Sequence, residues 1–199
     1  MARKRLAVEA NENKFETVEN ATGIIIRTRK LTETSLIVSW CTDEWGLIKT
    51  VAKGARGRKS VFTGKLDLFV EAELGWVRSR SQTSELHSLR EIRVMNLRAT
   101  LREDYGRTVL GSYFGELVER AVETESEVPE ITDLLRRGLD FLAEGGECKR
   151  ALPFFEKELA GFLGVGRTAG YSARLQEVLA GGFPRSRREA ARMAGLEES

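Results

Sequence analysis

A stretch rich in lysine, arginine and glycine is the part of this 199-residue sequence best suited to chemistry. It reads TVAKGARGRKSVFTGKL over residues 50–66, holds three glycines and no acidic residue, and follows directly on Lys49. Its basic residues are Lys53, Arg56, Arg58, Lys59 and Lys65. Cationic side chains neutralise phosphates, and glycines let backbone N–H groups approach them closely. The loop by itself fits two interpretations equally well, nucleic-acid binding and a solvated loop kept soluble by charge.

Basic residues in the predicted neighbouring strands extend the same chemistry. Arg27 and Arg29 share one face of a strand, because alternate side chains point to the same side, and Lys49 and Lys53 share one face of another. If these two faces adjoin, they continue the loop into a basic groove. Two further basic residues are expected at the end of that groove, Arg78 and Arg80. Contact with about five phosphates predicts a log–log salt slope of roughly −3.5 on single strands, at about −0.7 per phosphate.

The aromatic residues divide into core positions and one stacking candidate. Trp40 and Trp76 alternate in phase with aliphatic neighbours, which predicts that both lie in the core. Phe62 lies inside the basic segment, where a base stacked on its ring would contribute roughly 1–3 kcal/mol. The alternative for Phe62 is a plug over the open end of a barrel.

Catalytic chemistry has little support in the residue inventory. His87 is the only histidine, and a structural or surface role is expected for it. Cys41 and Cys148 are the only cysteines, and because they are 107 positions apart they form neither a disulfide framework nor a CxxC metal site. The stretch GVGRTA at 164–169 matches a dinucleotide fingerprint, but it follows a predicted helix instead of a strand. No catalytic residue, metal or cofactor is predicted.

Five runs of alternating or β-branched residues predict the strands that position the basic residues. They cover residues 22–30, 34–40, 46–53, 66–80 and 86–95. No helical stretch between them is long enough for a parallel crossover, so they predict a five-stranded antiparallel barrel of the OB type.

Beyond residue 95 the apolar period changes to about 3.6, which predicts helices and an α+β class. Asn96 is expected to cap the first helix, and a second helix is expected to begin near Pro129 and to end at the glycines of EGG. Ser186 and Glu189 have capping-box spacing at the start of the last one. The other predicted helices lie near residues 152–163 and 173–179.

Charge supports the same division of the chain. Residues 21–100 hold fourteen basic and eight acidic residues, and residues 101–199 hold fourteen and eighteen. A basic body suits a polyanion, and the acidic one suits a different partner. We expect a flexible extension over residues 1–20, an OB-type nucleic-acid-binding domain over 21–96 and a helical domain over 97–199. The sequence predicts no membrane span and no signal peptide, so a cytoplasmic location is expected.

Several stretches together resemble a known family. The segment TGIIIRTRKLTETSLIVSWCTDEWGLIKTVAKGARGRKS at residues 22–60 closely resembles the opening of the RecO family of bacterial recombination mediators, including its AKGAR signature. GKLDLF at 64–69 and LHSLREIRV at 86–94 are also similar to that family. The resemblance is strong over about residues 22–95, moderate to about residue 165, and absent from the first twenty residues.

The resemblance implies an OB-fold that binds single- and double-stranded DNA, a helical C-terminal domain and a role in DNA repair near the bacterial nucleoid. Family members anneal complementary strands, and with the partner RecR they help to load the RecA recombinase onto DNA coated by single-strand-binding protein, whose C-terminal tail they contact. The resemblance assigns DNA binding to Arg27, Arg29, Lys53 and Arg56. Many relatives carry a four-cysteine zinc module in the helical half, but Cys148 is the only cysteine in that half here, so zinc is not expected.

Two other interpretations remain open from the residues. The chain could be an interaction adaptor whose acidic helical half binds a protein while the barrel acts as scaffold. It could also be an OB-fold protein that binds RNA, because phosphate contacts barely distinguish the two polymers. Titration with a labelled oligonucleotide separates the first interpretation from DNA binding, and competition between matched DNA and RNA strands separates the second.

Overall fold

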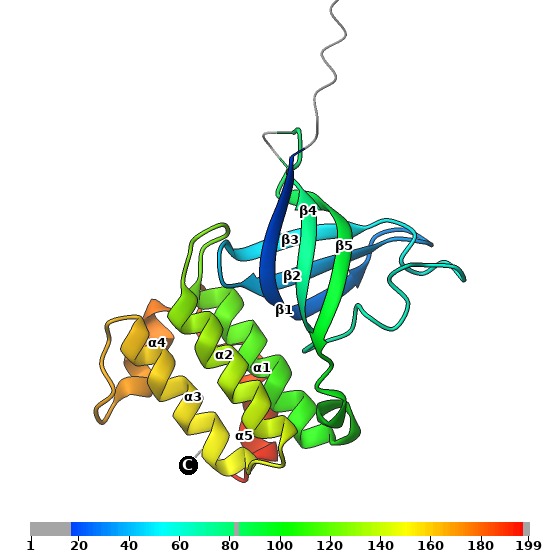
Figure 1. Ribbon diagram of the computed structural model, residues 1–199. Helices are drawn as coiled ribbons and strands as arrows, with labels where there is room; N and C mark the ends of the chain where they lie inside the picture. Colours follow the sequence, from blue (N-terminus) through cyan, green and yellow to red (C-terminus); the bar gives the residue numbers. More distant parts are fainter. Residues whose placement is uncertain (1–16, 82–83, 197–199) are drawn as a thin grey trace, which may run out of the picture.

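A computed structural model describes residues 17–81 and 84–196 (Figure 1). A barrel of strands forms one part of the molecule, and the helices pack together beside one end of it (Figure 1). This arrangement confirms the predicted α+β class. Most of the extension predicted at residues 1–20 lies outside the described residues, and the first strand begins at Val18. No helix in the described ranges is long and apolar enough to cross a membrane.

The five strands are β1 (Val18–Lys30), β2 (Leu36–Thr42), β3 (Gly46–Ala52), β4 (Glu71–Val77) and β5 (Leu86–Asn96). They close into a barrel in the order β1-β2-β3-β5-β4, which confirms the predicted five-stranded barrel. The sheet is mixed where a purely antiparallel one was expected, because β3 and β5 pair in parallel. The physical reason is that β4 pairs on the other side of β5, so the chain reverses direction twice between β3 and β5.

The barrel interior is filled by the side chains that the alternation placed there. Trp40 and Trp76 are both fully buried, as predicted. The indole N–H of Trp40 donates to Thr50 Oγ1 at 2.9 Å, which satisfies its one polar atom inside the core. A β-bulge between Ile25 and Arg27 then changes the phase of β1. The extra residue, Ile26, packs in the helix-side core, and Arg27 is returned to the outer surface.

A short 3₁₀ helix, η1 (Ala99–Glu103), leads from β5 into the helical region. The helices that follow are α1 (Tyr105–Ala121), α2 (Pro129–Ala143), α3 (Cys148–Phe162), α4 (Tyr171–Val178) and α5 (Arg187–Met193). α2 begins at the predicted Pro129, a position where proline costs no helical hydrogen bond. Aromatic and leucine side chains of α1, α2 and α3 form the core, in which the rings of Phe114 and Phe155 stack at 4.0 Å between centroids.

Two of the predicted helix caps are wrong. Asp104, and not Asn96, caps α1, and it accepts a hydrogen bond from the Arg107 N–H at 2.8 Å. The Asn96 side chain instead accepts from the Arg98 N–H at 3.0 Å, because the chain makes a turn and the η1 helix before α1 begins. Ser186 makes no side-chain cap, because its hydroxyl donates to Glu116 of α1.

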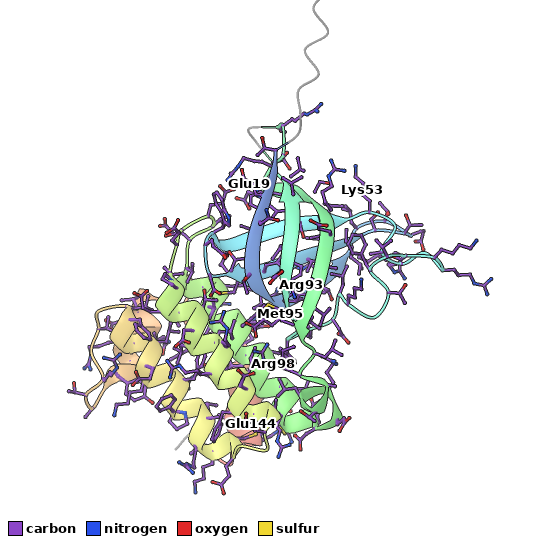
Figure 2. The ribbon with its side chains drawn as sticks, in the orientation of Figure 1. Glu19, Lys53, Arg93, Met95, Arg98 and Glu144 are labelled. Atoms are coloured by element: carbon purple, nitrogen blue, oxygen red, sulfur yellow. The ribbon has the colours of Figure 1, made fainter. Side chains whose placement is uncertain are left out.

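A buried charge network joins the barrel to the helices. Arg98, labelled at this junction in Figure 2, has a side chain only 1% exposed. It donates to Glu71 Oε2 of β4 at 2.6 Å, to Asp140 Oδ1 of α2 at 2.6 Å and to the Phe69 carbonyl at 3.0 Å. Arg136 of α2 binds the other oxygen of Glu71 at 2.7 Å and both carboxylate oxygens of Asp43. Glu71 and Asp43 of the barrel are thus paired with Arg98 and Arg136, which lie beyond β5, and these pairs fix the orientation of barrel and helices.

Candidate nucleic-acid interface

One outer surface of the barrel, here called the β1–β3 face, brings the predicted strand residues together. Cross-strand pairing sets Arg27 opposite Ser39 and Ser39 opposite Lys49, so these side chains form one row across three strands. The next row is Arg29, Ile37 and Val51. The arrangement follows from the period of two along each strand, together with the bulge that restores Arg27 to this side. In an OB-fold, strands 2 and 3 and their adjoining loops are the surface that binds oligonucleotides.

The basic loop, residues 53–70, continues this face at the end of β3. Figure 2 shows Lys53 on the side of the barrel away from the helices. Lys53, Arg58 and Lys59 are exposed, and no described carboxylate pairs with any of them. The loop is folded by short turns, such as the Gly57 N–H donating to the Gly54 carbonyl at 2.9 Å, with Gly54 at a φ of +70° that glycine adopts without strain. Its cations are therefore presented to solvent from an ordered backbone.

Arg56 contributes in a different way from its neighbours. Its guanidinium donates to the carbonyls of Thr32 and Glu33, at 3.4 and 3.0 Å, in the connection between β1 and β2. The Arg56 N–H also donates to the Thr34 carbonyl at 3.0 Å. Arg56 thus holds the basic loop against the β1–β2 connection. Lys65, near the far end of the loop, is half-buried.

Phe62 is not available to stack on a base. Its side chain is 6% exposed and packs in the barrel core with residues of the strands. The structure supports the alternative of a plug, because the loop folds back over the barrel and places the Phe62 ring in the barrel core. The exposed apolar residue of the loop is Val61, which has no aromatic face.

A groove of about 740 Å³ lies between the β1–β3 face and α1. Arg27, Arg29 and Lys49 all line it, as the predicted sharing of faces requires. Arg27 is engaged by α1, because its Nε lies 3.0 Å from both carboxylate oxygens of Glu119. That hydrogen bond raises the pKa of Arg27, which stays charged. Lys49 pairs with Glu85 at 2.9 Å in an exposed bridge of the kind that contributes little and that a phosphate can replace.

Arg78 and Arg80 lie apart from the basic loop. The Arg78 guanidinium lies 5.3 Å from the ring centroids of both Trp45 and Trp76 and pairs with Glu125. Trp45 precedes β3 and the basic loop follows it, so Arg78 marks the opposite end of that strand. Arg80 is exposed on the connection between β4 and β5. Neither residue lines the groove.

His87 has the structural role that was predicted for it. Its side chain is 3% exposed, and its Nδ1 accepts a hydrogen bond from the Ser79 N–H at 3.2 Å. The proton of the neutral ring therefore lies on Nε2, which donates to Glu125 Oε1 at 3.1 Å. Burial lowers the pKa of His87, although Glu125 acts in the opposite direction.

A pH dependence of stability follows from this histidine. As the pH falls below about 6.5, the unfolded chain binds a proton at His87 while the folded chain stays neutral, so the free energy of unfolding decreases. The loss ends at the lower folded pKa, and one proton limits its slope to about 1.4 kcal/mol per pH unit. Urea unfolding between pH 7.5 and 5 measures it. His87→Gln keeps a donor and an acceptor but no titration, and an equal slope in this variant would contradict the assignment.

The patterns of strands and loops in the sequence do not single out two arginines of this groove. Arg120 of α1 and Arg185, in the segment before α5, also line the groove. They lie far along the chain in the acidic half, where nothing in the local pattern distinguishes them from other exposed arginines. Only the packing of α1 against β1 brings them to the barrel. Gly115 permits that packing, because a Cβ atom there would lie 3.3 Å from the Cβ of Ile26.

Metal binding, thiol chemistry and dinucleotide binding have no support in the part of the chain that the structure describes. No group of three histidine, cysteine or acidic side chains in residues 17–81 and 84–196 could hold a metal ion. Burial raises the pKa of the Cys41 thiol to about 11, so it is protonated at neutral pH and packs as a small core residue. The glycines of GVGRTA lie between α3 and α4, without the strand that a dinucleotide site requires.

A closed five-stranded barrel of the OB type, followed by a helical region, defines the class of this protein: an OB-fold protein of the α+β class. Residues 17–98 match the family model described as recombination protein O N terminal, and residues 102–180 match the one described as recombination protein O C terminal. The chain belongs to the RecO family of DNA repair proteins.

Curated relatives agree with this assignment. The chain is 32% identical over 134 residues to DNA repair protein RecO of Syntrophus aciditrophicus, a match covering 67% of this chain and 51% of the relative. It is 33% identical over 165 residues to the protein of the same name from Anaeromyxobacter sp. (strain K), covering 82% and 61%. The Pasteurella multocida protein of the same name is 32% identical over 155 residues, a match that covers 76% of this chain and 61% of the relative. The chain thus spans between half and two thirds of the length of these relatives.

Proposed function

We propose that this protein is a non-enzymatic recombination mediator that binds single- and double-stranded DNA through the β1–β3 face and the basic loop. Membership of the RecO family supports the role in repair, and the observation that carries the binding site is the cluster of Lys53, Arg58 and Lys59. These side chains are exposed, have no described carboxylate partner and continue the row of cations on the barrel. The division into a barrel domain at 21–96 and a helical domain at 97–199 is part of this proposal.

The proposed mechanism is charge neutralisation and involves no bond making or breaking. Two complementary strands repel each other until cations displace the counterions around their phosphates. A surface that neutralises one strand lets the second approach, so that the bases pair and the strands anneal. We infer that the helical region serves contacts with a RecR-like mediator and with the C-terminal tail of single-strand-binding protein, so that a recombinase is loaded in the bacterial cytoplasm.

Single-strand affinity is expected to fall steeply with salt, with a log–log slope of roughly −3.5 for about five phosphates. Fluorescence anisotropy with a labelled oligonucleotide between 50 and about 300 mM salt measures the slope, and strand annealing is followed in the same buffers. A slope near zero would contradict a phosphate-binding surface. A chain that held a protein partner without any affinity for oligonucleotides at low salt would be the adaptor, and preference for RNA over a matched DNA strand would make it an RNA-binding protein.

A further inference from the structure

The groove beside the barrel has a second wall that comes from the end of the helical region. One side is the β1–β3 face with Arg29 and Lys49, and the other side includes Ala180 and Arg185. Arg185 lies beyond residue 180, where the match to the family's C-terminal model ends. A basic side chain outside the matched ranges therefore faces the cations of the barrel across one cavity.

The segment that carries Arg185 is held in place by α1. The guanidinium Nη1 of Arg120 donates to the carbonyls of Ala180, Gly181 and Gly182 at 3.1, 3.1 and 2.9 Å. The Ala180 N–H donates in turn to the Arg120 carbonyl at 3.3 Å. Arg120 lines the groove, but its donors are directed to these carbonyls. Its main effect is to fix the segment against the last turn of α1.

The residues on either side of Arg185 are fixed as well. Pro184 is buried, and its carbonyl accepts from the Arg187 N–H at 3.0 Å. The Ser186 hydroxyl donates to Glu116 of α1 at 2.5 Å. Arg185 between them is exposed and has no hydrogen bond or ion pair with any residue of the described ranges. Its backbone is therefore ordered while its guanidinium is available to a ligand.

We propose that Arg185 is a nucleic-acid contact, which binds the phosphates of a single strand lying in the groove between the barrel and the helical region. This inference rests on the proposed function and adds a second wall to its site. Guanidinium matches phosphate in a two-pronged geometry, so a strand held by Arg29 and Lys49 on one side gains a contact from the other side.

The shape and lining of the groove favour a single strand. A volume of about 740 Å³ lies in the range, about 300–1,000 Å³, that holds one drug-sized molecule, comparable with about one or two nucleotides. Half-buried aliphatic side chains, Ile37 and Leu47 among them, lie between the basic walls. Unpaired bases have exposed faces that can contact such a surface, whereas in a duplex those faces are stacked on one another. The carboxylates of Glu116 and Glu119 are already engaged by Ser186 and Arg27, which reduces their repulsion of a phosphate.

The test compares Arg185→Gln with Arg188→Gln, which removes the same charge from an exposed residue of α5 that does not line the groove. Arg185→Gln is expected to weaken single-strand binding by about threefold to tenfold at moderate salt and to reduce the log–log salt slope by about 0.7. Arg188→Gln is expected to leave the slope unchanged, and Arg185→Lys to retain it. Circular dichroism confirms folding of each variant.

The possible outcomes separate this inference from the function on which it rests. If the unchanged protein binds a labelled oligonucleotide but Arg185→Gln and Arg188→Gln behave alike, Arg185 makes no contact and the inference is overturned while the proposed function stands. If the unchanged protein has no affinity at low salt, the proposed function fails first. A slope reduced by Arg185→Gln alone and restored in Arg185→Lys supports the contact.

Discussion

Reversing the charge of Lys53, Arg58 and Lys59 together, each to glutamate, is expected to weaken single-strand binding at least about a hundredfold at moderate salt. Three phosphate contacts are lost, so the log–log salt slope falls by about 2, and the new carboxylates repel the strand. Because these side chains are exposed and have no described partner, the free energy of unfolding should change by less than about 1 kcal/mol. Oligonucleotide anisotropy against salt and urea unfolding measure the two quantities.

A matched control distinguishes a local contact from the change in net charge. α3 has three exposed basic residues, Lys149, Arg150 and Lys157. Their reversal to glutamate changes the net charge by the same amount. This control should lower affinity only through long-range repulsion, which salt screens beyond about 10 Å. Equal losses in the two triple variants would show that the basic loop makes no direct contact. Arg56 is excluded from the triple variant, because it holds the β1–β2 connection.

Replacing Arg98 with methionine is expected to destabilise the protein by about 3–5 kcal/mol. The substitution keeps much of the side-chain volume but leaves the Phe69 carbonyl without its buried donor and removes one of the two arginines that neutralise Glu71. Urea unfolding measures the change. Because the network joins the barrel to α2, separate unfolding transitions of the two parts in this variant would show directly that Arg98 couples them.

Two further variants test the cause of that loss. Arg137 pairs with Asp133 one turn away on the exposed side of α2, and Arg137→Met should cost less than about 0.5 kcal/mol. Adding Glu71→Gln to Arg98→Met should destabilise less than the sum of the single variants, because the buried carboxylate is then neutral. Strict additivity would mean that the charge pair is not what stabilises the junction.

Part of the candidate site follows from short-range patterns in the chain. The spacing of two residues between Arg27 and Arg29, and between Lys49 and Val51, sets which side chains share a strand face. The basic loop is visible as a run of lysines, arginines and glycines. The role of each cation is not visible there. Arg56 donates to backbone carbonyls and Phe62 packs in the barrel core. Both contacts arise because a loop this long folds on itself and contacts segments that are distant in the chain. A residue-type pattern contains no information about those partners.

What the sequence alone determined about this protein is the barrel of five strands, the helices after it and the concentration of positive charge in the first half, since each depends on the local period of apolar and charged residues. The tertiary structure alone decided the parallel pairing of β3 with β5, the pairing of Arg27 with Glu119 and the arrival of Arg185 beside the barrel. The parallel pairing follows from the place of β4 on the other side of β5. The other two bring together segments far apart in the chain, because β1 and α1 bury a common apolar surface around Ile26 and Gly115. Burial of that surface sets the distance between the two walls of the groove.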